Sequence, residues 1–328
     1  MSASKRRNRS SMQNLFLYAL RRTAVAVPSL LFVVFIVYTL SFYGAGDPIK
    51  LIFLRAPGDV AFDPQRVEAM REGAGLNRPF FVQFASYVWN GLQGNFGNSL
   101  VSGRSVASMV GPAAKVSLQL GLATIVLTAI AGIPLGAIAA FRKHSAVDRS
   151  ITTVCLFLWA LPPYVIGPLL MVAVMVFVPQ YGVPTGWGGL TDHRIILPLL
   201  VLSLQPIAQI QRQTRSAVID AVTENHVRTA RAKGLPRHLV AWRHVLRPVL
   251  TPIVTQMGML AITFINGAIF SEVVFGLPGL GRLTVSAMTD ADYPVILAIT
   301  LLGTLSVIAA NLAVDLLYPL IDPRVRLP

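Results

Sequence analysis

The stretch "VSLQLGLATIVLTAIAGIPLGAIAA" (residues 116–140) contains 25 residues and no charged side chain. An α-helix rises 1.5 Å per residue, so about 20 residues cross the roughly 30 Å hydrocarbon core of a bilayer. This stretch is therefore long enough to span a membrane. The chain of 328 residues has the same character throughout, because 54% of it is hydrophobic and only 13% is charged. We predict an all-α polytopic membrane protein.

Five further apolar runs accompany this stretch. They are residues 23–43, 151–178, 195–210, 252–275 and 295–320. The run at 195–210 is short and contains two prolines, so we expect its helix to continue toward Arg215. The run at 23–43 follows a basic N-terminus, but it is too long for the apolar region of a signal peptide and no A-x-A cleavage site follows. The sequence therefore predicts six transmembrane helices, of which the first is not cleaved.

The short charged segments predict the orientation. Six spans place both termini on one side, and that side holds 19 of the 28 Lys and Arg residues. Because Lys and Arg collect on cytoplasmic loops, both termini are expected in the cytoplasm. The expected order is a cytoplasmic tail (1–22), a first transmembrane helix (23–43), an extracytoplasmic helical loop (44–115), a five-helix core (116–320) that includes a cytoplasmic loop (211–247), and a cytoplasmic tail (321–328).

The loop at 44–115 is the largest segment between two apolar runs. "DPQRVEAMREGAG" (63–75) predicts a short helix capped by Asp63, with a proline at its first position and a glycine near its end. "RPFFVQFASYVWNGLQG" (78–94) predicts a second, amphipathic helix. We expect a small helical lid on the outer face.

A basic segment, "ENHVRTARAKGLPRHLVAWRHVLRPVL" (224–250), lies between two apolar runs. It predicts two short helices, because Gly234 is a stop signal for a first helix over 217–233 and Pro236 suits the first turn of a second. The backbone of Gly234 is expected to adopt a positive φ. Four apolar residues recur at helical spacing and predict one face of the second helix: Leu235, Leu239, Trp242 and Leu246.

Three functions fit a basic helix–turn–helix segment. A DNA-binding motif is disfavoured, because the segment is confined between two membrane spans and no second soluble domain exists to dimerise. A basic loop against anionic lipid remains possible. Lipid attraction, however, does not require two helices with a glycine hinge, and an apolar face on a cytoplasmic segment calls for a groove on a partner protein.

Residues 226–248, "HVRTARAKGLPRHLVAWRHVLRP", resemble the EAA loop of ABC importer permeases, in its dipeptide/oligopeptide variant. Arg228-Thr229-Ala230 stands where the general pattern has Glu-Ala-Ala, and Leu246-Arg247-Pro248 where the subfamily has Leu-Arg-Asn. Other fragments match that family in order along the chain. They are "AGDP" (45–48), "GLNRPFFVQFASYVWNGLQGNFGNSL" (75–100), "ALPPYVIGPLL" (160–170), "YGVPTGWGG" (181–189), "SEVVFGLPGLGRLTVSAMTDADYPVI" (271–296) and "DLLYPLIDPRVR" (315–326).

This resemblance implies the permease subunit of an ATP-driven importer, with half of a translocation pathway for peptides and an alternating-access mechanism. It implies a second homologous permease, two ATP-binding subunits and an extracytoplasmic substrate-binding protein as partners, in a bacterial or archaeal cell membrane. The residues that it assigns to contact with the ATPase are Arg228, Thr229, Ala230, Lys233, Gly234, Leu239 and Trp242.

The sequence contains few motifs for nucleotide binding, metal binding or catalysis. No G-x-x-x-x-G-K-[ST] phosphate loop occurs, so ATP and Mg²⁺ are expected on the partner ATPases, and no cofactor is expected on this chain. The five histidines form no H-E-x-x-H pattern, and one cysteine, Cys155, cannot form a disulfide within the chain. We expect neither a catalytic nor a metal site, and no nucleic-acid partner.

Polar residues in or beside the apolar runs are the remaining candidates. Glu272, Asn266, Gln205 and Gln209 are candidates for the pathway or a gate, although such residues also join helices by hydrogen bonds. Arg282, Asp290 and Asp292 are candidates for contact with the binding protein, although each also fits an ordinary solvated rim.

Three other readings remain open. An importer of the same type for nickel, glutathione or a sugar-like compound is the nearest alternative, because the sequence does not specify the solute. An ATP-independent secondary transporter would leave the basic segment unexplained. An intramembrane enzyme would need a catalytic cluster that the sequence does not contain.

Overall fold

The computed structural model describes residues 77–183, 185–265 and 268–321 of the chain, together with residues 24, 27–40, 42, 43, 65, 68, 71 and 72. Helices dominate this part of the chain, and no β-strand occurs in it beyond one isolated bridge between Asn98 and Ser105. The all-α fold class is confirmed. The predicted tail at 1–22, residues 322–328 of the predicted tail at 321–328, and most of residues 44–76 of the predicted loop at 44–115 lie outside the described residues.

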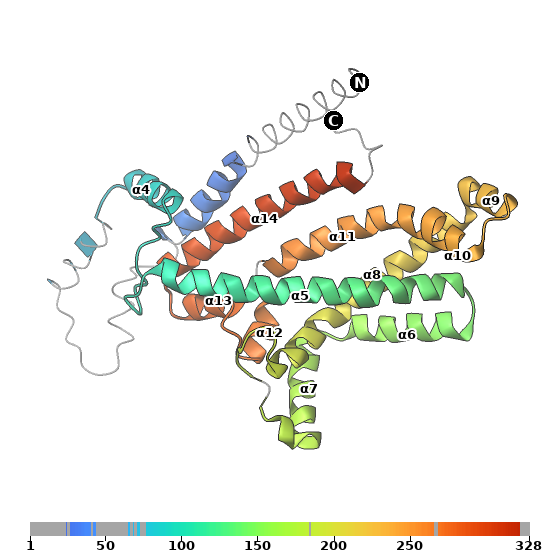
Figure 1. Cartoon of the computed structure of the whole chain (residues 1–328). Helices are drawn as coiled ribbons and strands as arrows, with labels where there is room; N and C mark the ends of the chain where they lie inside the picture. The colour runs from blue at the N-terminus through green and yellow to red at the C-terminus, as the bar shows by residue number, and fades with distance from the viewer. Residues whose placement is uncertain are drawn as a thin grey trace, which may run out of the picture.

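The helices lie as Figure 1 shows. An apolar helix near the N-terminus covers Val27–Leu40. The labelled α-helices are α4 (Phe80–Leu92), α5 (Val106–Phe141), α6 (Ala146–Ala160), α7 (Pro163–Phe177), α8 (Ile196–Thr223), α9 (Asn225–Ala232), α10 (Arg237–Leu239), α11 (Arg247–Ile265), α12 (Ile269–Val274), α13 (Leu280–Thr289) and α14 (Tyr293–Ile321). Two 3₁₀ turns, η1 (Pro179–Tyr181) and η2 (His193–Ile195), and a π-helical segment, η3 (Val240–Leu246), complete the order.

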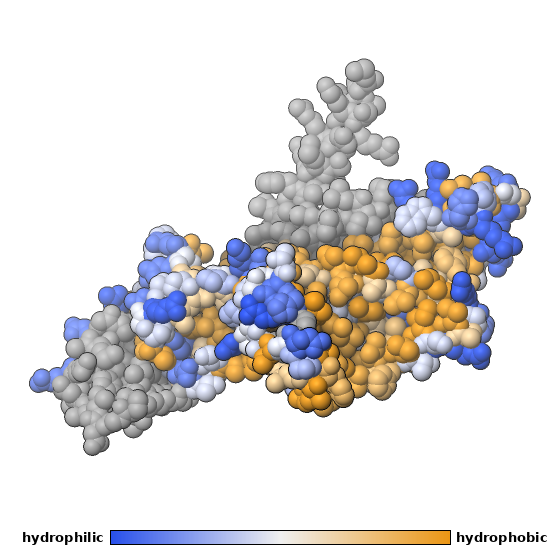
Figure 2. Space-filling view, turned by 60° about the horizontal axis from the view of Figure 1, so that its bottom comes forward, coloured by the Kyte–Doolittle hydropathy of each residue, from blue (hydrophilic) through white to orange (hydrophobic). Residues whose placement is uncertain are grey.

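Helix α5 is the centre of the fold. It packs against α6, α8, α11, α13 and α14. Helices α9, α10 and η3 lie at one end of the molecule, and α4 and α13 lie toward the other end (Figure 1). On the face that Figure 2 shows, hydrophobic residues cover much of the middle around one hydrophilic patch, and hydrophilic residues gather at the two ends. This distribution is the one that a membrane requires, because lipid replaces water around the middle of the molecule.

Two glycines of α5 allow it to approach α8 closely. A Cβ atom on Gly132 would lie 2.9 Å from Cγ2 of Ile210, and one on Gly136 would lie 2.5 Å from the backbone oxygen of Gln211. Any larger side chain would therefore push the two helices apart. Small residues at such contacts are characteristic of membrane helix pairs.

The helix boundaries differ from the predicted ones in four places. Helix α5 begins at Val106 and not at residue 116, because Val106, Val110 and Ala113 pack against α13 and α14 and extend the helix beyond the apolar run. The outer loop therefore ends near Ser105. The run at 151–178 forms two helices, α6 and α7, bent by 100°. Pro162 and Pro163 stand at this bend, where proline removes backbone donors.

The other two differences concern α8 and α11. Helix α8 continues through Pro206 as expected, but it ends at Thr223, so the loop predicted over 211–247 begins near Glu224 and not at residue 211. The run at 252–275 divides into α11, which already begins at Arg247, and the separate short helix α12. Proline inside a helix is tolerated where neighbouring helices surround it.

The number of spans is not settled by helix length alone. In the described part of the chain, three helices are long and apolar enough to cross a membrane, and the bent α6–α7 pair would make a fourth. The helix at Val27–Leu40 is apolar but shorter. The six-span count stays a prediction.

Candidate functional site

The basic segment forms a compact hairpin at one end of the molecule. Helix α9 buries Val227 and Ala230, and η3 buries Val240 and Val245. These four residues join one apolar cluster with side chains of α5, α8 and α11, including Ile210, Val218, Val249 and Ile253. The hairpin is therefore packed firmly against the long helices.

Gly234 ends α9 as predicted. Its φ is +72°, its N–H donates to the carbonyl of Arg231 at 2.9 Å, and the N–H of Leu235 donates to the carbonyl of Ala230 at 3.4 Å. These two bonds form the Schellman motif, which favours glycine because the positive φ strains a residue with a Cβ. The space around Gly234 is open, since no atom would lie within 4 Å of an added Cβ. The conformation alone therefore requires glycine here.

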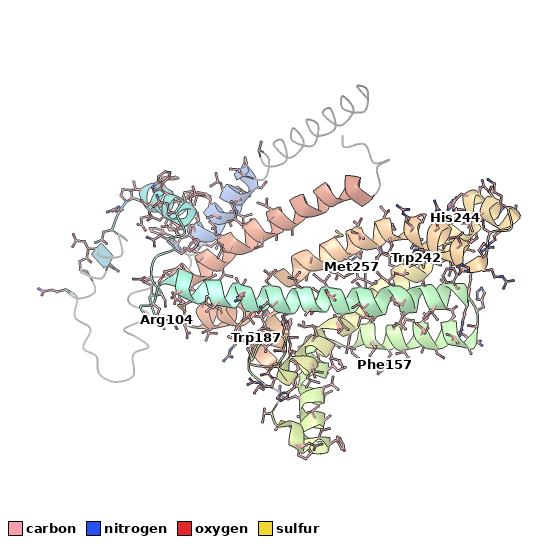
Figure 3. The ribbon with its side chains drawn as sticks, viewed as in Figure 1. Arg104, Phe157, Trp187, Trp242, His244 and Met257 are labelled. Atoms are coloured by element: carbon pink, nitrogen blue, oxygen red, sulfur yellow. The ribbon has the colours of Figure 1, made fainter. Side chains whose placement is uncertain are left out.

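The second helix of the hairpin differs from the expected regular helix. Because η3 is π-helical, each turn contains an extra residue and the buried positions become Val240, Val245 and Val249. Leu235 and Leu246 are partly buried against the same cluster. Trp242, which was expected on the same face, is 70% exposed. Figure 3 shows Trp242 and His244 at this end of the molecule, opposite Arg104.

The exposed side of the hairpin is basic. Arg228, Thr229 and Lys233 are exposed, whereas Ala230 belongs to the buried cluster and Leu239 is partly buried. A hollow lies between this hairpin and the C-terminal end of α5. Its lining combines the apolar Phe141, Leu235, Val240, Ala241 and Val245 with the basic Arg231, Arg237 and His238. The exposed Trp242 and a basic surface thus lie together at this end of the molecule.

Sequence reasoning missed the contacts that hold the hairpin closed. Nε2 of His226 on α9 donates to the carbonyl of His244 on η3, at 2.9 Å. The two histidines are 18 residues apart, so no spacing rule connects them. The apolar positions Val227 and Ala230, three residues apart, were the available signal for the buried side of α9.

Glu272, on α12, is fully buried and joins three helices. Its carboxylate accepts hydrogen bonds from the hydroxyl of Ser117 at 2.7 Å and from the N–H of Arg282 at 3.0 Å, while the Ser117 hydroxyl accepts from the N–H of Leu280. The carboxylate thereby occupies the N-terminus of α13, where unpaired N–H groups favour negative charge. Gly279 leaves the room for it, since an added Cβ would lie 2.5 Å from either carboxylate oxygen.

The three residues predicted to contact a binding protein lie in different environments. Asp292 is 4% exposed, and its carboxylate accepts from the Ser99 hydroxyl and from the N–H of Leu100. It joins the outer loop to the start of α14, so a partner contact does not fit its burial. Asp290 is exposed, and so is Arg282, whose guanidinium donates to the carbonyl of Gly276 at 2.7 Å. A partner contact of these two stays a prediction.

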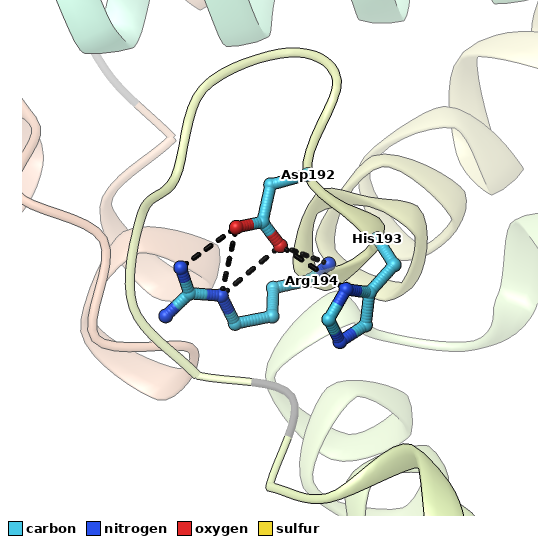
Figure 4. Close-up of polar contacts among 3 residues, drawn as sticks. All are labelled: Asp192, His193 and Arg194. Carbon is cyan, nitrogen blue, oxygen red and sulfur yellow. Dashed lines mark hydrogen bonds and ion pairs between the residues drawn. The ribbon is translucent and has the colours of Figure 1, made fainter.

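The loop before α8 is held by an ion pair within it. The Arg194 guanidinium donates to both carboxylate oxygens of Asp192, at 2.7 Å from NH2 and 3.0 Å from Nε, as Figure 4 shows. These bonds hold the pKa of the Asp192 carboxyl well below its usual range. Gly188 allows the pair to form, since a Cβ there would overlap the carboxylate. The same loop is fixed to α12, because the N–H of Gly186 donates to the carbonyl of Phe275.

The structure describes two of the three remaining pathway candidates, Gln205 and Gln209. Gln205 on α8 donates to the carbonyls of Trp159 and Leu161, both at 3.2 Å, so it holds the bend between α6 and α7. Gln209 lies one turn further along α8 and is partly buried. Asn266 lies outside the described residues. Gln205 and Gln209 therefore lie on one face of α8, whereas Glu272 lies on a different helix, α12.

A family model described as "Binding-protein-dependent transport system inner membrane component" matches residues 132–327. The chain belongs to this family. The match covers α6 to α14 and includes the basic hairpin, so the resemblance inferred from the sequence is confirmed. This protein is a permease subunit of the ABC importer type, and it resides in a membrane.

Curated relatives extend the similarity over almost the whole permease. The oligopeptide transport system permease protein AppB of Bacillus subtilis is 34% identical over 321 residues, which cover 94% of this chain and 99% of the relative. The dipeptide transport system permease protein DppB of Escherichia coli is 31% identical, with 94% and 98% covered. The glutathione transport system permease protein GsiC of Escherichia coli is 37% identical, also with 94% and 98% covered.

A solved structure has a similar fold. It is entitled "Inward facing conformations of the MetNI methionine ABC transporter: CY5 native crystal form", and its matching chain superimposes with a TM-score of 0.52. The superposition covers 65% of this permease and 96% of that chain, at 14% sequence identity. At this identity the comparison supports the fold alone.

Proposed function

We propose that this permease imports small peptides, as half of a translocation pathway driven by ATP hydrolysis on separate subunits. Relatives named for oligopeptide, dipeptide and glutathione transport support the solute class. Glutathione is itself a tripeptide with free carboxylates, so these solutes share one chemistry. The proposed class is therefore a short peptide with a free carboxylate.

The packing of the α9–η3 hairpin is the observation that supports coupling between ATP hydrolysis and the membrane helices. Its inner face is buried with α8 and α11, and its outer face presents Trp242 and exposed basic residues. An ATPase subunit that moves this outer face would move α8 and α11 with it as a rigid body. We propose Arg228, Thr229, Lys233, Gly234 and Trp242 as the ATPase-facing set, with Ala230 and Leu239 supporting it from within.

The rest of the assembly follows from this arrangement. A second homologous permease would complete the pathway, two ATPases would carry ATP and Mg²⁺, and a binding protein would deliver solute on the opposite side. We propose that the hairpin lies in the cytoplasm together with both termini, and the excess of Lys and Arg on that side supports this orientation. Arg282 and Asp290, exposed near α13, are proposed as contacts of the binding protein.

Transport by the reconstituted complex tests this function. The permease would be co-purified with its partners, placed in proteoliposomes, and supplied with a radiolabelled dipeptide bound to the binding protein. We expect uptake that requires ATP and stops when the partner ATPases cannot hydrolyse it. Uptake of equal rate without ATP would favour a secondary transporter and refute the proposal.

A matched solute panel separates the remaining possibilities. Glutathione and nickel would be offered to the same vesicles at equal concentration. Saturable uptake of dipeptides or glutathione supports a peptide-class solute, whereas uptake of nickel alone would contradict it.

A further inference from the structure

Helix α8 carries a row of polar residues on one side. Gln205, Gln209, Arg212 and Ser216 recur at i, i+4, i+7 and i+11, so they fall on one face of the helix. None of them is fully buried in this chain, and both Arg212 and Ser216 are exposed. Ile210 and Val218 lie on the opposite side of α8 and belong to the core. We call the four polar residues the α8 polar row.

Arg212 stands within a helix that is apolar enough to cross a membrane. It precedes the end of α8 at Thr223 by 11 residues, or about 16 Å of helix. Arginine in a membrane-spanning helix is costly against lipid, so it normally faces protein or a water-filled cavity. No carboxylate of the described residues forms an ion pair with it, in contrast to the nearby Arg215, which pairs with Asp148 at 2.6 Å.

The guanidinium of Arg212 is nevertheless held in place. Its Cζ lies 5.3 Å from the centre of the Trp159 ring on α6, within the range of a cation–π contact. Gln205 of the same polar row donates to the backbone carbonyl of Trp159, and so ties this end of α6 to α8. A small hollow beneath the pair is lined by Cys155, Ala208 and Gln211. The stack therefore orients the positive charge without neutralising it.

A buried amide lies at the base of this arrangement. Gln211 is 1% exposed and lines the hollow, and neither its Oε1 nor its Nε2 has a hydrogen-bond partner among the described residues. A buried amide without partners is costly. Water entering the hollow would supply the missing bonds, which is the situation expected beside an aqueous path.

We propose that the α8 polar row lines the water-filled pathway and that Arg212 contacts the carboxylate of the passing solute. The first half of this inference is independent of the solute, whereas the second half rests on the proposed peptide transport. A guanidinium matches a carboxylate in shape and charge, through two parallel N–H donors. The contact would be transient, because transport requires that each site release its solute.

Thiol labelling of the complete complex in nanodiscs tests the first half. In a Cys155→Ala background, Gln209→Cys and Ser216→Cys would each be exposed to charged methanethiosulfonate reagents. The control is Ile130→Cys, because Ile130 is 66% exposed and lies 11 residues before the end of α5, like Arg212 in α8. We expect modification at 209 and 216 but not at 130. Protection of both test positions would overturn the assignment and indicate that lipid or the second permease covers the row.

The charge of Arg212 is tested by the rates of two reagents. Residues three apart in a helix are neighbours, so the field of Arg212 at position 209 should make an anionic sulfonate reagent react about tenfold faster than a cationic trimethylammonium reagent. We expect Arg212→Gln to remove this preference and Arg212→Lys to retain it. A preference that persists in Arg212→Gln would come from another charged group and not from Arg212, and would overturn the proposal.

Peptide uptake tests the second half. Arg212→Gln is expected to lower dipeptide uptake about tenfold at unchanged insertion, and Arg212→Lys to restore a substantial part of it. Normal uptake by Arg212→Gln would refute the carboxylate contact. If the wild-type complex imports no peptide while the labelling pattern holds, the proposed solute class fails and the pathway assignment stands.

Discussion

The substitution Gly136→Ala tests the close packing of α5 on α8. The added Cβ would lie 2.5 Å from the backbone oxygen of Gln211, 2.6 Å from Cβ of Thr214 and 3.1 Å from the backbone nitrogen of Arg215. Because two of these atoms belong to the backbone, rotation of a side chain cannot relieve the overlap. The helices must separate, and overpacking of this kind costs about 1–3 kcal/mol.

Gly111→Ala is the matched control for this effect. Gly111 lies in the same helix, and no atom would lie within 4 Å of its added Cβ. Replacing glycine by alanine within a helix stabilises it by about 0.5–1 kcal/mol when nothing clashes. We therefore expect the two variants to differ in unfolding free energy by about 2 kcal/mol, with Gly136→Ala the less stable.

The assay is the thermal midpoint of the purified complex in detergent. A difference of this size corresponds to roughly 4–8 °C in Tm, if the permease responds like a soluble domain of 150–250 residues. Insertion into the membrane should be unchanged for both variants. Equal midpoints for Gly136→Ala and Gly111→Ala would refute the close approach of α5 and α8 described above.

Three further predictions concern the outer end and the hairpin. Asp292→Asn should lower the Tm of the complex by a few degrees, because the carboxylate is buried with Ser99. The affinity for the binding protein should stay unchanged, because the carboxylate does not face a partner. A selective loss of this affinity at unchanged Tm would contradict the prediction. The pKa of the Asp192 carboxyl is lowered by Arg194, so the ion pair stabilises fully above the ordinary aspartate pKa of about 3.9 and is lost only as the pH falls toward the lowered value. Asp192→Asn should accordingly reduce Tm by a constant amount between pH 5 and 8, and a pH-dependent difference in that window would count against the pair. Trp242→Ala should weaken association with the ATPase subunits by about tenfold or more, as expected for an exposed aromatic anchor, with Tm of the isolated permease unchanged; undiminished co-purification would exclude Trp242 from that interface.

The sequence predicted well those features that depend on local pattern. Long apolar runs identified α5, α8 and α14, and the Gly234 stop followed from the conformational freedom of glycine alone. The division of 151–178 into α6 and α7 was not predicted. The apolar run continues across Pro162 and Pro163, and hydropathy carries no information on the angle between two helices.

The candidate site was predicted less completely, because its contacts join distant parts of the chain. Ser99 and Asp292 are separated by 193 residues, and Ser117 and Glu272 by 155. No pattern in one sequence relates such pairs. The π-helical η3 is a second case, since it changes which residues face inward and leaves Trp242 exposed although the regular spacing grouped it with Leu239.

The hairpin of α9 and η3 is proposed to couple this permease to ATP hydrolysis, and its glycine turn is the point at which this coupling is tested. Gly234→Val strains the turn at φ +72° and should misdirect η3, at a local cost of about 1 kcal/mol or more. Gly94→Val is its control, because Gly94 has φ +76° and equally open surroundings but lies just after α4, at the other end of the molecule.

The deciding measurement is substrate-stimulated ATP hydrolysis by the two reconstituted complexes, at matched membrane insertion. We expect Gly94→Val to keep the stimulation of the wild type and Gly234→Val to lose most of it. Full stimulation in the well-inserted Gly234→Val complex would contradict the account, and the basic hairpin would then be better explained as a contact with anionic lipid.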